Sequence, residues 1–259
     1  MKIGRFLALS IISLYLVFLY LPIIVNVLGS LSPRRYIIDL SNITLAWYFK
    51  AFSNRDVVVA TINSIELSVT SSLISTLAGF LTGYAFLMRK PRGFVDTVIY
   101  VPIIIPEIIE AFTLALFYIE LGFEMGFLTV LLGHLTFNIA YAFVIIRSRL
   151  ELIPQEIIQS AKVLGASEMY ILARVITPLM TPAILSSMFL TFALSFDDLV
   201  KTLFTSGPGF KTLPILVWSM VGRGGVSPEI NAITTIILLV SLAISMILTY
   251  LIRRDIIRE

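Results

Sequence analysis

The sequence predicts an all-α membrane protein with six transmembrane helices and a cytoplasmic helix between the fourth and fifth of them. Its 259 residues are 58% hydrophobic and only 14% charged, whereas an ordinary soluble domain has about 25% charged residues. The apolar residues gather in six long runs, and a more polar, amphipathic segment separates the fourth run from the fifth. One soluble core cannot bury so much apolar surface at this length, so a bilayer must solvate it.

A spanning helix needs about 20 mostly apolar residues, and each run meets that length. The predicted spans cover residues 6–30, 61–88, 95–119, 126–147, 176–199 and 230–252, within one transmembrane domain over residues 1–259. Lys2 and Arg5 precede the first run, as they would in a signal peptide. That run exceeds the roughly 7–15 residues of a signal core, so we expect a retained membrane anchor. Gly79 and Gly83 in the second run predict a close helix crossing.

Positive charges orient the spans, because short loops rich in Lys and Arg stay on the cytoplasmic side. Most of the 19 lysines and arginines fall on one side if both termini are cytoplasmic. The cytoplasmic set is Lys2, Arg5, Arg89, Lys90, Arg92, Arg147, Arg149, Lys162, Arg174, Arg253, Arg254 and Arg258; the outer set is Arg34, Arg35, Lys50, Arg55, Lys201, Lys211 and Arg223. We therefore expect a multi-pass protein of the cell (plasma or inner) membrane with both termini in the cytoplasm.

The outer loop over residues 31–60 carries an aromatic trio, Trp47, Tyr48 and Phe49. Such rings are typical of a short helix in the headgroup region. A docking surface for another protein is the alternative, and one helix could serve both purposes.

The segment over residues 154–175 is too polar to span and is patterned as a helix. Ile157, Ala161, Leu164, Ile171 and Val175 recur near helical spacing and predict an apolar face. Gly165 divides the segment into two short helices. Small residues at 160, 161, 165 and 166 would let another protein approach closely, whereas the alternative is a helix lying on the bilayer.

This segment resembles the signature loop of the permease subunits of ATP-binding-cassette (ABC) importers. The signature is Glu-Ala-Ala, three residues, Gly, nine residues, then Ile-x-Leu-Pro; the matching positions here are Gln159, Ser160, Ala161, Gly165, Val175 and Pro178. Gln, Ser, Val and Thr177 replace the signature's Glu, first Ala, Ile and Leu. The resemblance implies a type I transmembrane domain in which this region is the coupling helix, with Gln159, Ser160, Ala161, Gly165 and Ala166 facing an ATPase subunit.

Residues 195–232 resemble the second permease subunit of spermidine and putrescine importers. The shared features are the Asp197-Asp198 pair, Ser-Gly-Pro at 206–208, Thr-Leu-Pro at 212–214 and Gly-Val-Ser-Pro-Glu-Ile-Asn-Ala at 225–232; residues 102–107 also resemble the family's third span. The resemblance implies half of a polyamine path, a second permease subunit (a homologue or the same chain), two cytoplasmic ATPase subunits and an extracytoplasmic binding protein.

Carboxylates within spans are expensive, and each is a candidate for substrate contact. Glu107 and Glu110 share a helix face, Asp197 and Asp198 end the fifth span, and Glu66 lies in the second. Acids would neutralise protonated amines, and aromatic rings would cover the methylene links. Trp218, Tyr118 and Phe196 are the ring candidates. Alternatively, Asp197 or Asp198 bonds nearby backbone, and Glu107 satisfies groups freed by Pro106.

Other chemistry has little support in the sequence. There is no cysteine, and the lone histidine, His134, is best interpreted as a satisfied packing residue, so we expect no metal site. Basic residues form no single face, which argues against nucleic acid. The nucleotide motif is missing, so we expect a non-enzymatic subunit with no cofactor of its own. The alternatives are import of an iron complex, thiamine or an oxyanion, a secondary transporter or channel, and an intramembrane hydrolase.

Overall fold

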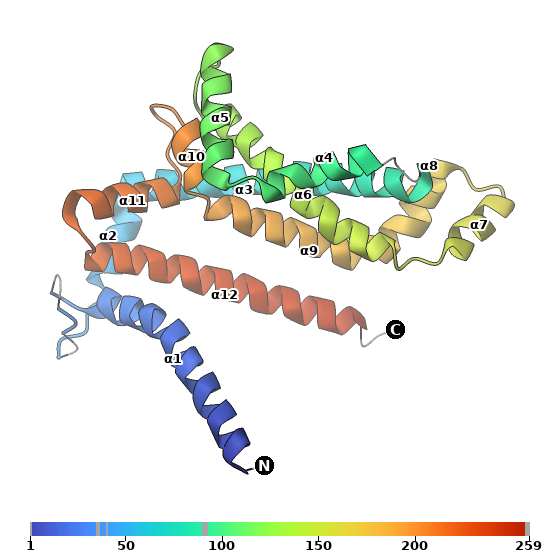
Figure 1. Cartoon of the computed structure of the whole chain (residues 1–259). Helices are drawn as coiled ribbons and strands as arrows, with labels where there is room; N and C mark the ends of the chain where they lie inside the picture. Colours follow the sequence, from blue (N-terminus) through green and yellow to red (C-terminus); the bar gives the residue numbers. More distant parts are fainter. Residues whose placement is uncertain (1, 35–36, 40, 90–92, 257–259) are drawn as a thin grey trace. The chain divides into compact units, whose positions relative to one another are not determined.

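The computed structural model describes residues 2–34, 37–39, 41–89 and 93–256 (Figure 1). Every regular element in this part of the chain is a helix, so the all-α class is confirmed. The helices form two compact units. The first combines Met1–Val58 with Val217–Glu259, and the second is Val59–Leu216.

The first unit is built on α1 (Lys2–Leu31), the short α2 (Ala46–Ser53) and α12 (Pro228–Ile256). Near its C-terminal end α1 packs against α12, where Thr234 donates a hydrogen bond to Asn26 Oδ1 at 3.0 Å. The rest of α1 diverges from α12 (Figure 1). Residues 9–22 of its apolar stretch Leu9–Leu31 are exposed within the structure, as expected for a helix that lipid surrounds, whereas Gly29 and Ser30 near its end are buried.

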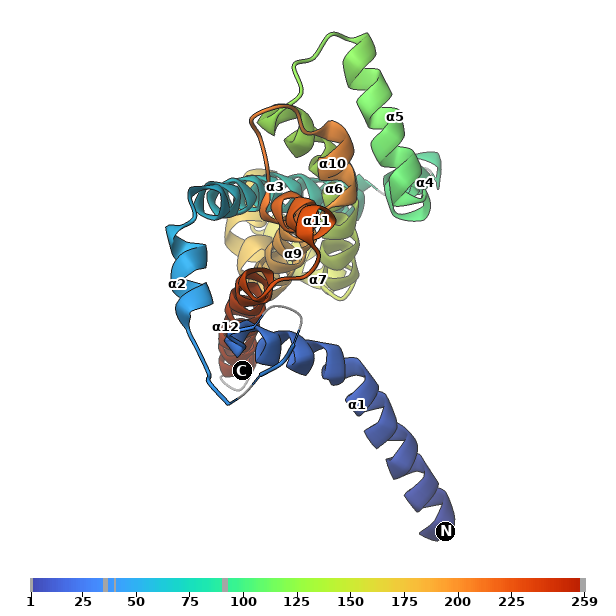
Figure 2. The same cartoon turned by 90° about the vertical axis from the view of Figure 1, so that its left-hand side faces the viewer.

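In the second unit α3 (Arg55–Arg89), α6 (Phe127–Leu150) and α9 (Thr177–Phe196) run side by side (Figures 1 and 2). The predicted crossing at Gly79 is confirmed. A Cβ built on Gly79 would lie 2.8 Å from Ala142 Cβ and 2.8 Å from the Phe143 backbone nitrogen. Only a glycine lets the two backbones approach this closely.

The segment after α6 contains α7 (Gln155–Val163), α8 (Glu168–Tyr170) and the π-helical turn η1 (Ile171–Ile176), which leads directly into α9. Gly165 divides the segment as predicted, with φ +80°. Its N–H bonds to the Lys162 carbonyl, and the Ala166 N–H bonds to the Ala161 carbonyl, both at 3.0 Å. These two bonds form a Schellman motif, which ends α7 and favours glycine at this position.

The predicted apolar face of this segment is partly wrong. Ile158 and not Ile157 is buried, and Leu164 is 86% exposed. Ile158 and Ile171 join a core cluster that also receives residues of α3, α6 and α9. The second half of the segment is no separate short helix, because α8, η1 and α9 form one continuous apolar helix over Glu168–Phe196.

Within the described part of the chain, four helices are long and apolar enough to span a membrane, namely Leu9–Leu31, Arg55–Arg89, Phe127–Leu150 and Glu168–Phe196. They correspond to the first, second, fourth and fifth predicted spans. The third is no continuous helix, because Thr97–Ile104 and Glu107–Glu120 are bent by 104° at a break before Pro106. Proline lacks the backbone donor and disfavours a helical residue before it. The described apolar part of the sixth is the shorter Pro228–Ala243, so the count of six stays a prediction.

Some of the basic residues on which the predicted orientation rests lie outside the described residues, namely Arg35, Lys90, Arg92 and Arg258. The cytoplasmic placement of both termini therefore stays a prediction.

Candidate functional site

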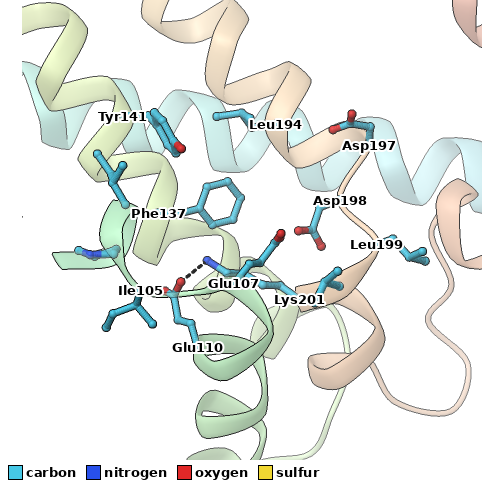
Figure 3. Close-up of a pocket in the computed structure, with 13 residues that line it drawn as sticks. Ile105, Glu107, Glu110, Phe137, Tyr141, Leu194, Asp197, Asp198, Leu199 and Lys201 are labelled. Carbon is cyan, nitrogen blue, oxygen red and sulfur yellow. Dashed lines mark ion pairs between the residues drawn. The ribbon is translucent and has the colours of Figure 1, made fainter. Parts of the chain in front are cut away.

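A cavity of about 490 Å³ lies in the second unit (Figure 3). Ligand pockets of proteins usually measure about 300–1,000 Å³. Its polar lining is Glu107, Glu110, Tyr141, Asp197, Asp198 and Lys201, and Phe137 adds an aromatic face. Four of the five predicted path residues thus lie around one cavity.

Two helix breaks build this cavity. The first separates α4 (Gly93–Ile104) from α5 (Glu107–Glu120), and its bend turns the first turn of α5 toward α6. The second separates α9 from the short α10 (Val200–Thr205), which packs against α5 and α6. Asp197 and Asp198 lie past the end of α9 and not within a helix. Their side chains are therefore not held about 100° apart, as those of adjacent helical residues would be. Both breaks leave acids at helix ends facing one space (Figure 3).

Lys201 is the basic group of the site, although its position in the sequence predicts an outer loop. It is 1% exposed. Its Nζ lies 2.6 Å from Glu110 Oε2 and 3.9 Å from the centroid of the Phe137 ring. Thr136 donates a short hydrogen bond to Glu110 and accepts one from Lys201 at 3.4 Å. The burial costs of the two charges are offset by this set of partners.

Asp198 is held by its own surroundings. Its Oδ1 accepts hydrogen bonds from the Thr202 backbone N–H at 2.8 Å and from the Thr202 hydroxyl at 2.9 Å. His134 Nε2 lies 3.2 Å from the same oxygen. The structure thus bears out the alternative in which one aspartate bonds nearby backbone.

His134 is a satisfied packing residue, as predicted from its apolar context. It is fully buried, and its Nδ1 lies 2.6 Å from Ser195 Oγ while its Nε2 lies 3.0 Å from Thr202 Oγ1. Because the Thr202 hydroxyl donates to Asp198, Nε2 must donate to Thr202 Oγ1; in the neutral ring, Nδ1 then accepts from Ser195 Oγ. The ring therefore joins the end of α9 to α10.

Glu107 and Asp197 are exposed to the cavity, and among the described residues neither forms an ion pair with a basic group. The Glu107 carboxyl lies within hydrogen-bonding distance of the Asp198 carboxyl. Trp218 is 60% exposed and lies on α11 (Leu213–Gly224) in the first unit. Tyr118 is buried against Phe123, and neither it nor Glu66 lines the cavity.

The predicted coupling residues fall at the end of α7 and in the turn after it. Gln159, Ser160 and Gly165 are exposed, whereas Ala161 and Ala166 are half-buried against the chain's own core cluster. The most exposed apolar side chains here are Val163, at 88%, and Leu164, at 86%, and neither is among the predicted coupling residues.

A metal is not suggested by the geometry. Within residues 2–34, 37–39, 41–89 and 93–256 no group of three His, Asp or Glu side chains could hold an ion.

The family model for the binding-protein-dependent transport system inner membrane component matches residues 75–258. The chain belongs to this family. The matched range includes the broken α4–α5 pair, the α7 segment and all residues of the cavity. Membership confirms the resemblance to ABC importer permeases and makes the chain a multi-pass membrane transport subunit and not an enzyme.

Three similar proteins match most of the chain. The spermidine/putrescine transport system permease protein PotC of Escherichia coli K12 is 36% identical over 255 residues, 98% of this chain and 96% of that protein. PotC of Haemophilus influenzae is 36% identical over 239 residues, 92% of each chain. The putrescine transport system permease protein PotI of E. coli K12 is 33% identical over 231 residues, 85% and 82% of the two chains.

Solved structures of importers share the fold of this family member. A bacterial ABC transporter involved in the import of the acidic polysaccharide alginate has a chain with a TM-score of 0.76, at 16% identity over 98% of this chain and 96% of that one. The MetNI methionine ABC transporter gives 0.59, at 15% identity over 78% and 98%. At these identities the likeness shows the fold alone.

Proposed function

We propose that the chain is a permease subunit of an ATP-driven importer and forms half of the path for a polyamine, spermidine or putrescine. The observation that carries this is the 36% identity to a spermidine/putrescine permease over 98% of the chain. The cavity supports it, because carboxylates of Glu107 and Asp197 are available to protonated amines and Phe137 and Tyr141 can cover methylene links.

The proposed assembly contains a second permease subunit, either a homologue or another copy of this chain, and two cytoplasmic ATPase subunits. An extracytoplasmic binding protein delivers the substrate, and the chain itself carries no cofactor. Both termini lie in the cytoplasm, so that the turn after α7 faces the ATPases while Gln159, Ser160 and Gly165 are exposed to them.

Uptake of labelled putrescine and spermidine by vesicles that contain the whole assembly tests the proposal. Glu107→Gln and Asp197→Asn should each raise the half-saturating amine concentration about tenfold, because a hydrogen bond to a charged group contributes about 1.5–3 kcal/mol. Glu120→Gln is the matched control, since Glu120 is an exposed acid at the other end of α5. Uptake of thiamine, an iron complex or an oxyanion, with no uptake of putrescine or spermidine, would refute the polyamine assignment.

The subunit purified alone should hydrolyse no ATP. ATPase activity should appear only when the nucleotide-binding subunits are added. Robust hydrolysis by the isolated chain would contradict the division of labour proposed for the assembly.

A further inference from the structure

One ammonium-binding position of the cavity is already filled by the chain itself. Lys201 Nζ lies 2.6 Å from the Glu110 carboxylate, 3.4 Å from the Thr136 hydroxyl and 3.9 Å from the centre of the Phe137 ring. An ammonium has three donors and no acceptor, and a carboxylate, a hydroxyl and an aromatic face are the partners that it prefers. These three residues therefore form a cradle for a primary ammonium group.

The Lys201 side chain is buried in this cradle, so that protein groups and not solvent surround its ammonium. Lys201 is 1% exposed, and its side chain and that of Glu110 are 2% and 12% exposed in the pair. Burying a lysine is costly unless a partner compensates its charge. Glu110 supplies that charge, and Lys201 in turn removes Glu110 from the acids that an entering cation meets.

The other acids at the cavity are not equivalent. Asp198 accepts hydrogen bonds from Thr202, lies against His134 and is also hydrogen-bonded with the Glu107 carboxyl, which itself stays open to the cavity. Glu107 and Asp197 are exposed to the cavity and belong to the two opposite helix breaks (Figure 3). The cavity therefore presents two carboxylates to a substrate and keeps a third neutralised by its own lysine.

We propose that Lys201 is a specificity-determining residue, a tethered ammonium that fills one cation position and makes the cavity favour a diamine over a triamine. The inference rests on the proposed function, since it concerns the number of amines in the substrate. A dication can pair with Glu107 and Asp197 together. A trication brings a third ammonium for which the matching carboxylate, Glu110, is already paired, and it also meets the charge of Lys201.

Transport by the whole assembly in vesicles tests this, with putrescine as the diamine and spermidine as the triamine. Lys201→Met keeps the apolar stem and frees Glu110. The ratio of kcat/KM for spermidine to that for putrescine should rise about tenfold, the usual gain of one charge-assisted hydrogen bond. Lys211→Met is the matched control, because Lys211 is an exposed lysine of the same unit outside the cavity. The spermidine-to-putrescine ratio of this variant should equal that of the parent assembly.

Two further variants separate this effect from a fold defect. Lys201→Gln leaves a neutral donor beside Glu110 and should raise the ratio as Lys201→Met does. Lys201→Met combined with Glu110→Gln removes both charges, so no unpaired acid stays buried, and the ratio should return to within about twofold of the parent. Rates are normalised to the amount of assembled transporter.

The outcomes distinguish the two proposals. A parent assembly that carries neither amine refutes the polyamine function, and this inference with it. A parent that carries both amines, with the same ratio in Lys201→Met and Lys201→Gln as in the parent, overturns the role of Lys201 alone. A raised ratio that persists in the double variant also overturns it, because the freed Glu110 would not be the cause.

Discussion

The ammonium of Lys50, in the last turn of α2, lies 2.8 Å from a carboxylate oxygen of Glu229, in the first turn of α12. The other carboxylate oxygen of Glu229 accepts a hydrogen bond from Asn54 Nδ2 at 3.3 Å. Lys50 also lies 5.3 Å from the centre of the Trp47 ring. One acid therefore ties α2 to the start of α12, which accounts for the packing of α2 against that helix.

Glu229→Gln should lower the free energy of unfolding of the first unit by about 1 kcal/mol, because it removes the ion pair and an acid at a helix N-terminus. Lys50→Met should cost less, since only the partly exposed pair is lost. Thermal unfolding of the full chain in detergent measures both. Asp56→Asn, an exposed acid in the first turn of α3, controls for the helix-end effect alone. A larger loss in Lys50→Met than in Glu229→Gln would contradict this ranking.

The α3–α6 crossing should not tolerate even one added methyl group at Gly79. Gly79→Ala places a Cβ 2.8 Å from a backbone nitrogen of α6, so the helices must move apart. Overpacking of this kind costs about 1–3 kcal/mol. Gly222→Ala is the control, because nothing lies within 4 Å of its Cβ position and alanine favours a helix. Thermal unfolding in detergent should separate the two variants, and equal midpoints would show that the crossing is not tight.

The junction of α9 and α10 should depend on the ring of His134. His134→Leu leaves the buried Ser195 hydroxyl and the Asp198–Thr202 pair without the ring, at a cost of about 1–3 kcal/mol for buried polar groups. His134→Gln retains a donor and an acceptor and should lose less. Thermal unfolding of the full chain is the measurement. A leucine variant as stable as the parent would mean that the ring is replaceable by apolar packing.

The long, uniformly apolar helices could be predicted from the sequence, because lipid imposes both their length and their composition. The break in the third predicted span could not be placed this way, although Pro106 signalled it. Hydropathy sums over a window and does not register a bend of 104° between two apolar halves. The same averaging put Asp197 and Asp198 at the end of a helix that stops at Phe196.

The candidate site shows the other limit of sequence reasoning. Glu107, Glu110, Asp197 and Asp198 were found because an acid in an apolar run is conspicuous. Lys201 was assigned to a loop because its burial depends on Glu110, a residue far away in the chain that only the fold brings within 2.6 Å. Its one local signal was its position three residues after Asp198 in an otherwise apolar stretch.

The turn after α7 offers the sharpest test of how an ATPase would act on this chain. Val163 and Leu164 are 88% and 86% exposed, directly before the left-handed Gly165 that fixes their direction. We expect these exposed apolar side chains to contact an ATPase subunit, where a charge placed in the contact would be buried without a partner. The double variant Val163→Asp, Leu164→Asp should therefore lower the rate of ATP-driven amine uptake by the assembly at least tenfold. The unfolding of the isolated chain should shift by no more than about 0.5 kcal/mol. Ile43→Asp is the control, because Ile43 is an apolar residue, 65% exposed, between α1 and α2; this variant should transport normally. Transport at the parent rate by the double variant would mean that the ATPase subunit does not contact this turn.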